Sequence, residues 1–546
     1  MRSTLIILAA ACTAVSGILF CPLLAQISVV TPNPAIVSIT VGRPLAAVVK
    51  VPDTIFGSFL EPIGNSINHG LSAEILSNPS LESGLWSQAN LKKLFAQQPS
   101  LERVSGQFGL PVPWQPLDPK AGRRFEIHAG DGANTWQSVE IMGVPGHGVG
   151  LMQQVYLPTH RVLTYDASFY ARHLEGSPTI TVLLLASDSG KVLAKRMVAA
   201  TGSAWTKYTA RLSVKSGQVQ PLQPVRFAIQ VAPDERVDVD EFSLMPTDAV
   251  DGFDPDVVTL ARTMGLTELR LSGNFSSNYH WRDGIGPLVQ RKTMENIAWG
   301  IPEYNKFGTD EFLAFCKMIH AIPQIGLNLG SGTPQEAADW VRYIRRHYDG
   351  PVIYELGNEL YGKWQVGWVP TDQIARQTRE FSAAVRAVES KAPLIATGGM
   401  PQDFMTWNAQ QLTNQPGTFE YLSTHLIRQT NHDALPNATP DFLAAAAYGL
   451  SYYVGRNFQQ MQAQVNAAPG YQDGKVHLAM TEWLFSSRGK GERVFTNESP
   501  TSTNEGGALM VASIFNTLIR TSPKGKLLDL IVMRYTDDCW VIFPGN

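Results

Sequence analysis

The chain is short of cysteine, which limits how it can be cross-linked. It has 4 Cys in 546 residues, and two of them, Cys12 and Cys21, lie in an apolar N-terminal segment. Cys316 and Cys539 are the two that remain. One disulfide between them stays open, but a disulfide framework is excluded, and there is no paired-cysteine spacing typical of a zinc site.

An excess of charge of one sign is lacking as well. The 44 Lys and Arg nearly balance the 47 Asp and Glu, which gives a formal net charge of -3. Proteins that bind nucleic acid neutralise phosphates with a basic surface, so nucleic acid is not expected as a partner. The hydrophobic content of 44% is typical of globular proteins, and the length suits two or three domains of ~100–200 residues each.

Long apolar runs are lacking after the N-terminal segment. Arg2 precedes an apolar stretch from Leu5 to Leu24, and the sequence ending at Ala25 resembles a signal-peptide cleavage site. We therefore expect residues 1–25 to be a signal peptide, and the mature protein to be secreted or periplasmic without membrane contact. An uncleaved anchor is the alternative, because about 20 apolar residues can span a bilayer.

The next two segments predict strands. Residues 26–84 hold a short strand at 37–41 and a second that ends at Glu61. Residues 85–247 are rich in short alternating runs separated by turn residues, which predicts an inserted all-β sandwich. Its clearest strands are expected at 162–170, 179–185, 207–212, 225–231 and 237–243.

From residue 248 to residue 546 strands alternate with helices. Helices are expected at 256–264, 310–319 (capped by Thr309), 334–347, 371–390, 440–453 with a further run to 465, and 505–520. Strands are expected at 269–271, 323–328, 352–356, 394–397, 421–424, 476–480 and 528–533. With the strand that ends at Glu61 there are eight, which predicts an α/β fold: a (β/α)8 TIM barrel with the sandwich inserted after its first strand. An open sheet is the alternative.

Polar side chains gather where the barrel strands end, which is where barrel enzymes build their active sites. A carboxylate at such a position is costly to desolvate unless it has a partner or a function. The residues are Glu61, Asn274, Asn328 (inside the third strand), Asn358, Glu359, His425 and Glu482.

Glu359 and Glu482, at the ends of the fourth and seventh strands, suit glycosidic bond cleavage. One carboxyl group donates a proton to the leaving oxygen and the other attacks the anomeric carbon, at a separation of ~5–5.5 Å in retaining enzymes. Their like charges are expected to raise the pKa of one member and keep it protonated as the acid. Taken singly, each residue also has a structural interpretation, such as a rim carboxylate, a turn asparagine or a structural histidine.

Several stretches of the sequence resemble glycoside hydrolase family 51, the α-L-arabinofuranosidases. In chain order these are Ile55–Gly64, Ala73–Asn78, Leu269–Phe275, Trp281–Pro287, Phe307–Phe312, Tyr354–Glu359 with Trp364-Gln365, and Thr481–Trp483. The resemblance covers most of residues 50–520. It implies that Glu359 is the general acid/base and Glu482 the nucleophile. It further implies that Glu61, Asn274, Asn358 and His425 bind the sugar, with Trp299 as a wall.

The resemblance also has consequences for the domains. Residues 85–247 are similar to carbohydrate-binding family 4, so this module is expected either to bind glycan or to brace the barrel. Family members continue into a C-terminal β-sandwich, so the resemblance implies that this domain is missing or truncated in a sequence that ends at Asn546. The chain departs from the family pattern at Leu426 and Ile427, where an aromatic residue is usual, and at Leu271-Ser272, where Pro-Gly is usual.

Three hypotheses for function follow. The first is retaining release of α-L-arabinofuranosyl groups from plant-type polysaccharides or oligosaccharides. The second is an endo-acting β-glucanase or xylanase on the same barrel, and the third is a secreted glycan-binding protein without catalysis. No cofactor and no catalytic metal are expected, because carboxylate pairs cleave glycosides without them; a structural Ca²⁺ in the sandwich and a homo-oligomer are left open.

Overall fold

The protein is described by a computed structural model that covers residues 53–121, 124–134, 136–176, 178–399, 404–431, 439–472, 474–488, 505–521 and 531–534. The expected signal peptide at 1–25, the strand at 37–41 and Cys539 lie outside the described residues. Among the helices of the described part, none is both long and apolar enough to cross a membrane.

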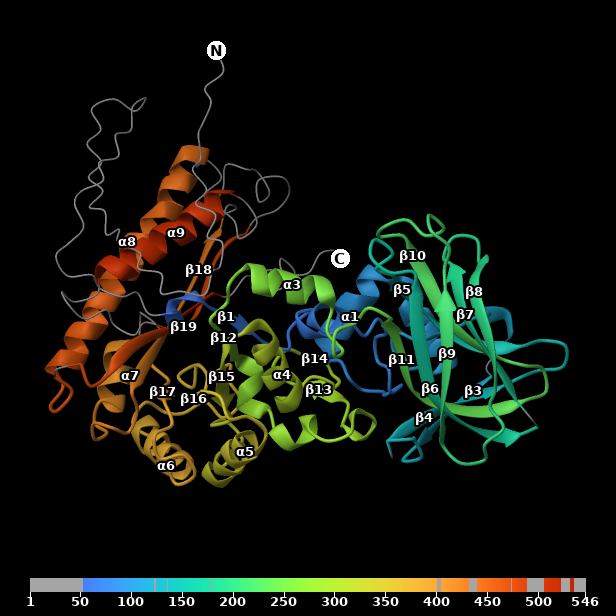
Figure 1. Cartoon of the computed structure of the whole chain (residues 1–546), viewed down its shortest axis with the longest axis horizontal. Coiled ribbons are helices and arrows are strands. Elements are labelled where there is room, and N and C mark those ends of the chain that lie inside the picture. Colours follow the sequence, from blue (N-terminus) through green and yellow to red (C-terminus); the bar gives the residue numbers. More distant parts are fainter. Residues whose placement is uncertain are drawn as a thin grey trace, which may run out of the picture. The chain divides into compact units, whose positions relative to one another are not determined.

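Eight parallel strands form a closed barrel (Figure 1). The first strand pairs with the second on one side and with the eighth on the other, which closes the sheet. The expected α/β barrel is therefore confirmed, and the open-sheet alternative is wrong. The strands are β1 Gly57–Leu60, β12 Glu268–Leu271, β15 Ile322–Leu327, β16 Ile353–Leu356, β17 Leu394–Ala396, β18 Tyr421–Asn431, β19 His477–Arg488 and β20 Ile531–Arg534.

Several barrel strands are short and buried along their whole length. Every residue of β1, β12 and β16 is buried, as expected for parallel strands packed on both faces. A cluster of Ile353, Ile395 and Ala479, with Ile322 and Tyr421 against it, joins the consecutive strands from β15 to β19 through apolar contacts. This packing holds the strand ends, and the polar residues that follow them, in fixed positions.

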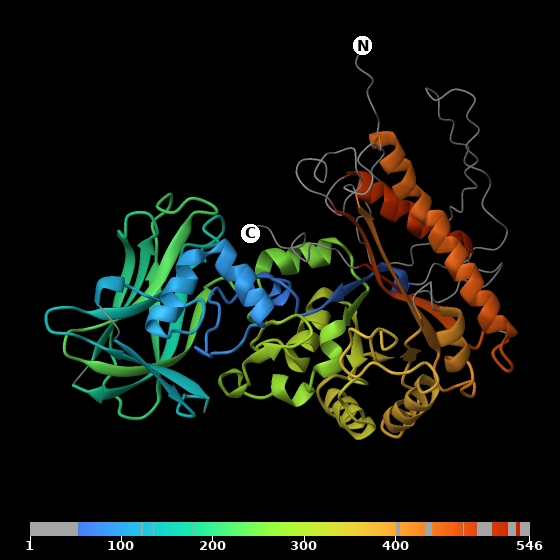
Figure 2. The ribbon, with the colours of Figure 1, turned by 180° about the vertical axis from the view of Figure 1, so that it is seen from behind.

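Helices follow the strands around the barrel (Figure 1). They are α3 Pro255–Thr263, α4 Thr309–Ile319, α5 Pro334–His347, α6 Ile374–Arg386, α7 Phe404–Gln411, α8 Pro440–Ala467 and α9 Glu505–Thr521. α5 has the predicted bounds, since Thr333 accepts the backbone N–H of Glu336 at 3.1 Å and Pro334 begins the helix. α8 is one continuous helix that runs alongside α9 in both views (Figures 1 and 2), and α7 was not predicted.

One predicted cap is wrong. Gly308, not Thr309, is the N-cap of α4, because the Glu311 carboxylate folds back and accepts the Gly308 backbone N–H at 2.8 Å. An acidic residue at the third helical position satisfies an N–H group that would otherwise lack a partner, so the helix begins one residue earlier.

Between β1 and β12 the chain forms two antiparallel sheets of five strands each. They share one apolar core, in which Phe227 of one sheet meets Phe242 of the other with ring centroids 6.4 Å apart. One sheet has the order β2 Gln115–Pro116, β5 Val149–Tyr156, β10 Pro224–Val231, β7 Thr179–Ala186 and β8 Val192–Ala199. The other has β3 Phe125–Ala129, β4 Gln137–Met142, β11 Arg236–Pro246, β6 Thr164–Glu175 and β9 Thr206–Ser213.

The start of this segment differs from the prediction of β structure from residue 85 onward. Two helices come first, α1 Gln88–Gln97 and α2 Pro99–Phe108. The buried residues of α2 are Leu101, Val104 and Phe108, whose spacing of three and four is helical, and Gly109 ends the helix in the left-handed conformation. The alternation that predicts strands begins only after this helical pair.

Candidate active site

Residues from six segments meet at the carboxyl ends of the barrel strands. His425 and Glu482 are paired in register and lie within β18 and β19, which continue past them, rather than at strand ends as predicted. Asn274 begins a short 3₁₀ helix, Asn274–Asn278, and Trp299 lies in the turn between β13 Met294–Asn296 and β14 Ile301–Glu303. Of the remaining members, Glu61 directly follows β1, and Asn358 and Glu359 come after β16 with Gly357 between.

Glu359, His425 and Glu482 form one buried cluster. Each offers a ligand atom, a carboxylate oxygen or a ring nitrogen, that lies within 4.8 Å of the others. His425 Nδ1 is 2.9 Å from Glu359 Oε1 and 3.7 Å from Glu482 Oε2, and its Nε2 is 3.0 Å from Thr481 Oγ1. The two carboxylates thus stand close enough to act on the same sugar, as the sequence led us to expect.

Arg270 organises this cluster, and the sequence analysis did not single it out. Its guanidinium is fully buried and donates to Glu355 at 2.6 Å, to Glu482 at 3.3 Å and to Asn358 Oδ1 at 2.7 Å. Breaking such a buried network is costly, because it leaves charges without partners. A signal was present in the sequence: Arg270 is a charged residue between Leu269 and Leu271 in a short buried strand.

The two asparagines predicted to hold sugar are themselves held in place. Asn358 Nδ2 donates to Asn274 Oδ1 at 3.3 Å, and the Gln365 amide donates to the same oxygen. Gln365 in turn accepts from the Ser277 hydroxyl at 2.9 Å. These bonds fix the orientations of the amides before any ligand arrives.

Glu61 is anchored by two donors. The Trp299 indole N–H donates to its Oε1 at 2.7 Å and the Phe275 backbone N–H at 3.0 Å. Gly273 passes close by with φ 110°, and a Cβ there would lie 2.2 Å from the Glu61 carboxyl carbon, so only glycine fits. Burial, reinforced by the charge of Glu482, raises the pKa of Glu61 to about 8.

This raised pKa predicts a pH-dependent gain in stability for Glu61→Gln. In unfolded chains glutamate ionises near its ordinary pKa of 4.5, whereas folded Glu61 keeps its proton to about pH 8. The wild type therefore loses stability as the pH rises between these values, at roughly 1.4 kcal/mol per unit, because ionisation favours the unfolded state. We expect the melting temperature of Glu61→Gln, relative to wild type, to rise from pH 5 to pH 8.

The matched control is Glu102→Gln at an exposed position on α2. Its melting temperature relative to wild type is expected to stay constant across the same range. A Glu61→Gln difference that is equally constant would contradict a protonated Glu61 in the folded protein.

Glu359 lies in a constrained backbone segment. It has φ 44°, in the left-handed region that non-glycine residues rarely occupy, and Gly357 just before it has φ 83°. Its carboxylate accepts from the Trp364 indole at 3.0 Å and the Tyr361 hydroxyl at 3.3 Å. Strain of this kind persists where the surrounding contacts hold a side chain in a functional position.

The ionisation of the pair differs from the sequence-based expectation. Burial alone would raise the pKa of Glu359, but the hydrogen bond and charge of His425 outweigh it and lower that pKa. Burial and then the charge of Glu359 raise the pKa of Glu482, against His425 and Arg270. The expectation that the acid has the raised pKa is therefore wrong for the unliganded protein, because His425 lies beside Glu359.

The two carboxylates in turn shift the pKa of His425. Burial would lower its pKa, but the charges of Glu482 and Glu359 outweigh burial and raise it. Three groups at these distances titrate together rather than separately. His425 Nδ1 and Glu359 Oε1 are joined by a 2.9 Å hydrogen bond, along which a proton can pass between the histidine and the expected acid.

Asn328 is the strand-end residue that stands apart from these contacts. It follows β15 instead of lying inside it, and its amide donates to the Tyr279 carbonyl at 3.1 Å and the Ser331 hydroxyl at 3.0 Å. Its contacts are those of a loop-bracing residue.

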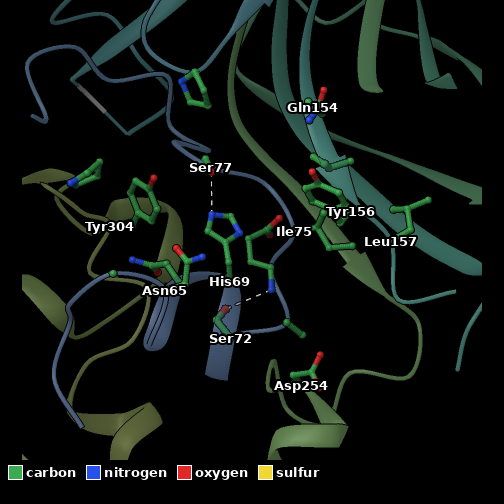
Figure 3. A pocket seen from close by; sticks show the side chains of 18 of the residues that line it. Asn65, His69, Ser72, Ile75, Ser77, Gln154, Tyr156, Leu157, Asp254 and Tyr304 are labelled. Carbon is green, nitrogen blue, oxygen red and sulfur yellow. Dashed lines mark hydrogen bonds between the residues drawn. The ribbon is translucent and has the colours of Figure 1, made fainter. Parts of the chain in front are cut away.

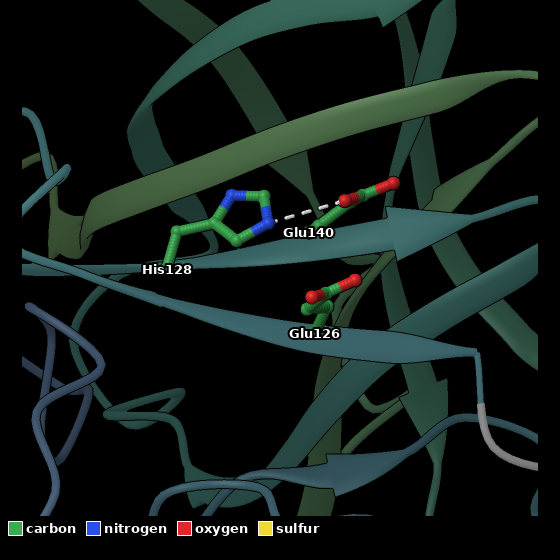
Figure 4. Close-up of side chains that lie close together, drawn as sticks. All are labelled: Glu126, His128 and Glu140. Carbon is green, nitrogen blue, oxygen red and sulfur yellow. Dashed lines mark ion pairs between the residues drawn. The ribbon is translucent and has the colours of Figure 1, made fainter.

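A second group of ionisable side chains lies on the sheets. His128 is 3.3 Å from Glu140 and 3.0 Å from Asp238, with Glu126 nearby (Figure 4). Glu140 is paired with Arg236, and Asp238 with Arg172, each at 2.6 Å. The arginines supply the positive charge that a metal ion would bring, so the contacts describe an ion-pair network.

A parallel barrel with two buried carboxylates close together on the carboxyl side of its sheet is an arrangement that glycoside hydrolases use. Residues 261–432 match the family model described as "Alpha-L-arabinofuranosidase 1 domain". The chain is thus similar to the α-L-arabinofuranosidases over this region, in agreement with the resemblance to glycoside hydrolase family 51 that the sequence motifs carry.

Curated relatives of the chain are also named as arabinofuranosidases. The chain is 28% identical over 302 residues to an intracellular exo-α-(1→5)-L-arabinofuranosidase of Streptomyces lividans, covering 50% of this chain and 44% of that one. It is 32% identical over 208 residues to such an enzyme of Bacillus subtilis, covering 34% and 41%. The alignments thus span less than half the length of these relatives.

A solved structure of an arabinose-bound family 51 α-L-arabinofuranosidase has a similar fold. Its TM-score is 0.62 at 17% identity, and the match covers 89% of this chain and 74% of that one. The likeness therefore extends over the fold of most of the chain.

Proposed function

We propose that the protein is a retaining α-L-arabinofuranosidase that releases terminal arabinofuranosyl groups from glycans. The observation that carries the proposal is the spacing of Glu359 and Glu482, whose nearest oxygens lie within 4.8 Å of each other. Retaining enzymes place the two carboxyl groups ~5–5.5 Å apart, whereas inverting enzymes need room for a water molecule between carboxylate and sugar. The names of the curated relatives supply the sugar.

The proposed reaction has two steps. First, Glu482 attacks the anomeric carbon and forms a glycosyl ester, while the bond to the leaving oxygen breaks and that oxygen takes a proton from Glu359. Second, Glu359 removes a proton from water, the water oxygen attacks the anomeric carbon, and the Glu482 carboxylate departs. Arg270, at 3.3 Å from Glu482, stabilises that carboxylate as nucleophile and as leaving group.

His425 supports the proton transfers in this scheme. When Glu482 becomes esterified its negative charge disappears, which removes one of the causes of the raised His425 pKa. The pKa of Glu359 is likewise tied to His425 through the 2.9 Å hydrogen bond. The histidine therefore acts as a positioning residue that passes its proton to Glu359 and takes it back.

The remaining polar residues are proposed to bind the sugar. Glu61, Asn274 and Asn358 present oxygens and amides around the carboxylate pair, and Trp299 holds Glu61 in place. Neutral Glu61 can donate as well as accept a hydrogen bond, which suits a sugar hydroxyl.

The test is hydrolysis of 4-nitrophenyl α-L-arabinofuranoside followed by proton NMR. We expect the α-anomer of arabinose to form first and the β-anomer to appear only as the sugar mutarotates. If the β-anomer forms first, the enzyme inverts and Glu482 is not a nucleophile. If no arabinose is released while an endo-substrate is cleaved, the proposed substrate is wrong.

Export is a separate proposal, which rests on the apolar stretch after Arg2. We propose that the chain is cleaved after Ala25 and leaves the cytoplasm. N-terminal sequencing of protein recovered from culture medium or periplasm should then begin at Gln26. Recovery of the whole activity in the cytoplasm with an intact N-terminus would contradict it.

A further inference from the structure

A cavity of about 880 Å³ lies apart from the carboxylate pair. This volume falls within the ~300–1,000 Å³ typical of small-molecule sites. Its barrel side is the segment 64–77 that follows Glu61, together with residues 301–304 that follow Trp299. The sheet side is the end of β5, and α1 forms a third wall.

The buried charged groups around the cavity already have hydrogen-bond or ion-pair partners within the protein. Glu74 is held by the backbone N–H groups of Leu244 at 2.8 Å and Leu76 at 3.0 Å. Arg161 is paired with Asp248 at 2.7 Å and Asp254 at 2.5 Å. Lys93 also lines the cavity, but its side chain is exposed and donates to Asn90 Oδ1 at 3.4 Å. The buried part of the lining therefore suits an uncharged ligand.

His69 projects into the middle of the cavity and is uncharged too (Figure 3). Burial lowers its pKa to about 4, so the ring is neutral at physiological pH. Its Nε2 is 2.8 Å from Ser77 Oγ, and its backbone has φ 65° inside a kinked turn. Non-glycine residues in this conformation cluster at ligand sites, where the surrounding structure compensates for the strain.

The opposite wall provides hydrogen-bonding amides next to an aromatic face. Gln154 and Tyr156 stand on β5 across from His69 and Asn65 (Figure 3). Tyr156 is 48% exposed, a large value for an aromatic side chain that lines a cavity. Within the described residues, no hydrogen bond occupies the side-chain amides of Asn65, Gln97 or Gln154, which leaves donors and acceptors for a ligand.

We propose that this cavity is a second, non-catalytic binding site for a neutral oligosaccharide. Sugars combine apolar ring faces, which pack on an aromatic side chain, with hydroxyl groups that both donate and accept hydrogen bonds, as amides and a neutral imidazole require. That the ligand is a glycan rests on the proposed function. The segments that carry Glu61 and Trp299 continue into the cavity wall. A glycan bound in this cavity therefore lies beside the catalytic site.

The site is tested by calorimetric titration of the full protein carrying Glu359→Gln, which prevents turnover. The probes are β-(1→4)-xylohexaose and α-(1→5)-L-arabinohexaose, in separate titrations. We expect Tyr156→Ala in this background to weaken binding of at least one hexaose about tenfold, through loss of the aromatic face. Tyr156→Phe keeps the ring and should bind within about twofold of the parent.

The matched control is Met197→Ala on β8, an apolar side chain that is 67% exposed and outside the cavity. It should leave both dissociation constants unchanged, and Gln154→Ala should weaken the same hexaose as Tyr156→Ala. Unchanged melting temperatures show that the variants fold. The proposal is overturned if neither hexaose binds, or if Tyr156→Ala and Gln154→Ala alter neither constant.

This test is independent of the proposed reaction. Release of arabinose by the wild type is measured separately, with the aryl glycoside. If no arabinose is released, the proposed activity is wrong. The titrations would still test whether the second site binds a glycan. Loss of the second site, in contrast, would leave hydrolysis of the aryl glycoside intact, since that reaction needs only the carboxylate pair and the residues around it.

Discussion

Glu482→Ala is expected to lower kcat on 4-nitrophenyl α-L-arabinofuranoside by about 10⁴-fold or more. The variant lacks the group that forms the covalent intermediate, and removal of a nucleophile typically leaves only the rate supplied by binding and the remaining polar groups. In the wild type, Glu482 accepts a hydrogen bond from Arg270 at 3.3 Å and lies 3.7 Å from His425 Nδ1. The variant leaves both side chains without this carboxylate. Steady-state kinetics on purified protein measure the loss.

Rescue of Glu482→Ala by azide tests whether Glu482 is the nucleophile. A small anion placed where the Glu482 carboxylate stood should restore part of the activity and give an arabinofuranosyl azide of inverted configuration. Glu380→Ala, on the exposed face of α6, is the control and should keep kcat within about twofold of wild type. Near wild-type turnover by Glu482→Ala would remove it from the mechanism.

The loss of activity in Glu359→Ala is expected to be larger for substrates whose leaving group must be protonated. For oligosaccharides, whose leaving oxygen must be protonated, kcat/KM should fall by roughly 10²–10⁴-fold, the usual contribution of a general acid. For 2,4-dinitrophenyl α-L-arabinofuranoside, whose leaving group departs without a proton, glycosylation should be nearly unaffected. Comparison of kcat/KM for the two substrates measures the difference.

The second step gives an independent check on Glu359. Without the general base, hydrolysis of the glycosyl ester slows, so kcat on the activated substrate should fall although kcat/KM holds. Azide should accelerate this step and give a product of retained configuration, the opposite of that from Glu482→Ala. An equal loss of kcat/KM on both substrates would show that Glu359 acts on binding or folding instead.

Local patterns were enough to predict the barrel and the approximate position of its chemistry. Strand–helix alternation depends on residues a few positions apart, and α5 has its predicted bounds because Thr333 and Pro334 start it regardless of the rest of the fold. The same reliance on local patterns led to an error in the segment between β1 and β12. The helices α1 and α2 were merged into the β segment, although Leu101, Val104 and Phe108 follow a helical period.

The sequence by itself determined the eight strands and the two glutamates at the barrel mouth, since both follow from residue type and position along each strand. Only the tertiary structure decided how those glutamates ionise. The pKa of Glu359 depends on His425 in β18, and Glu482 depends on Arg270 in β12, neither of which is near in sequence. Hydrogen bonds need contact and charge interactions are strongest at short range, so the side chains that fold to within hydrogen-bonding distance set the chemistry of each carboxylate.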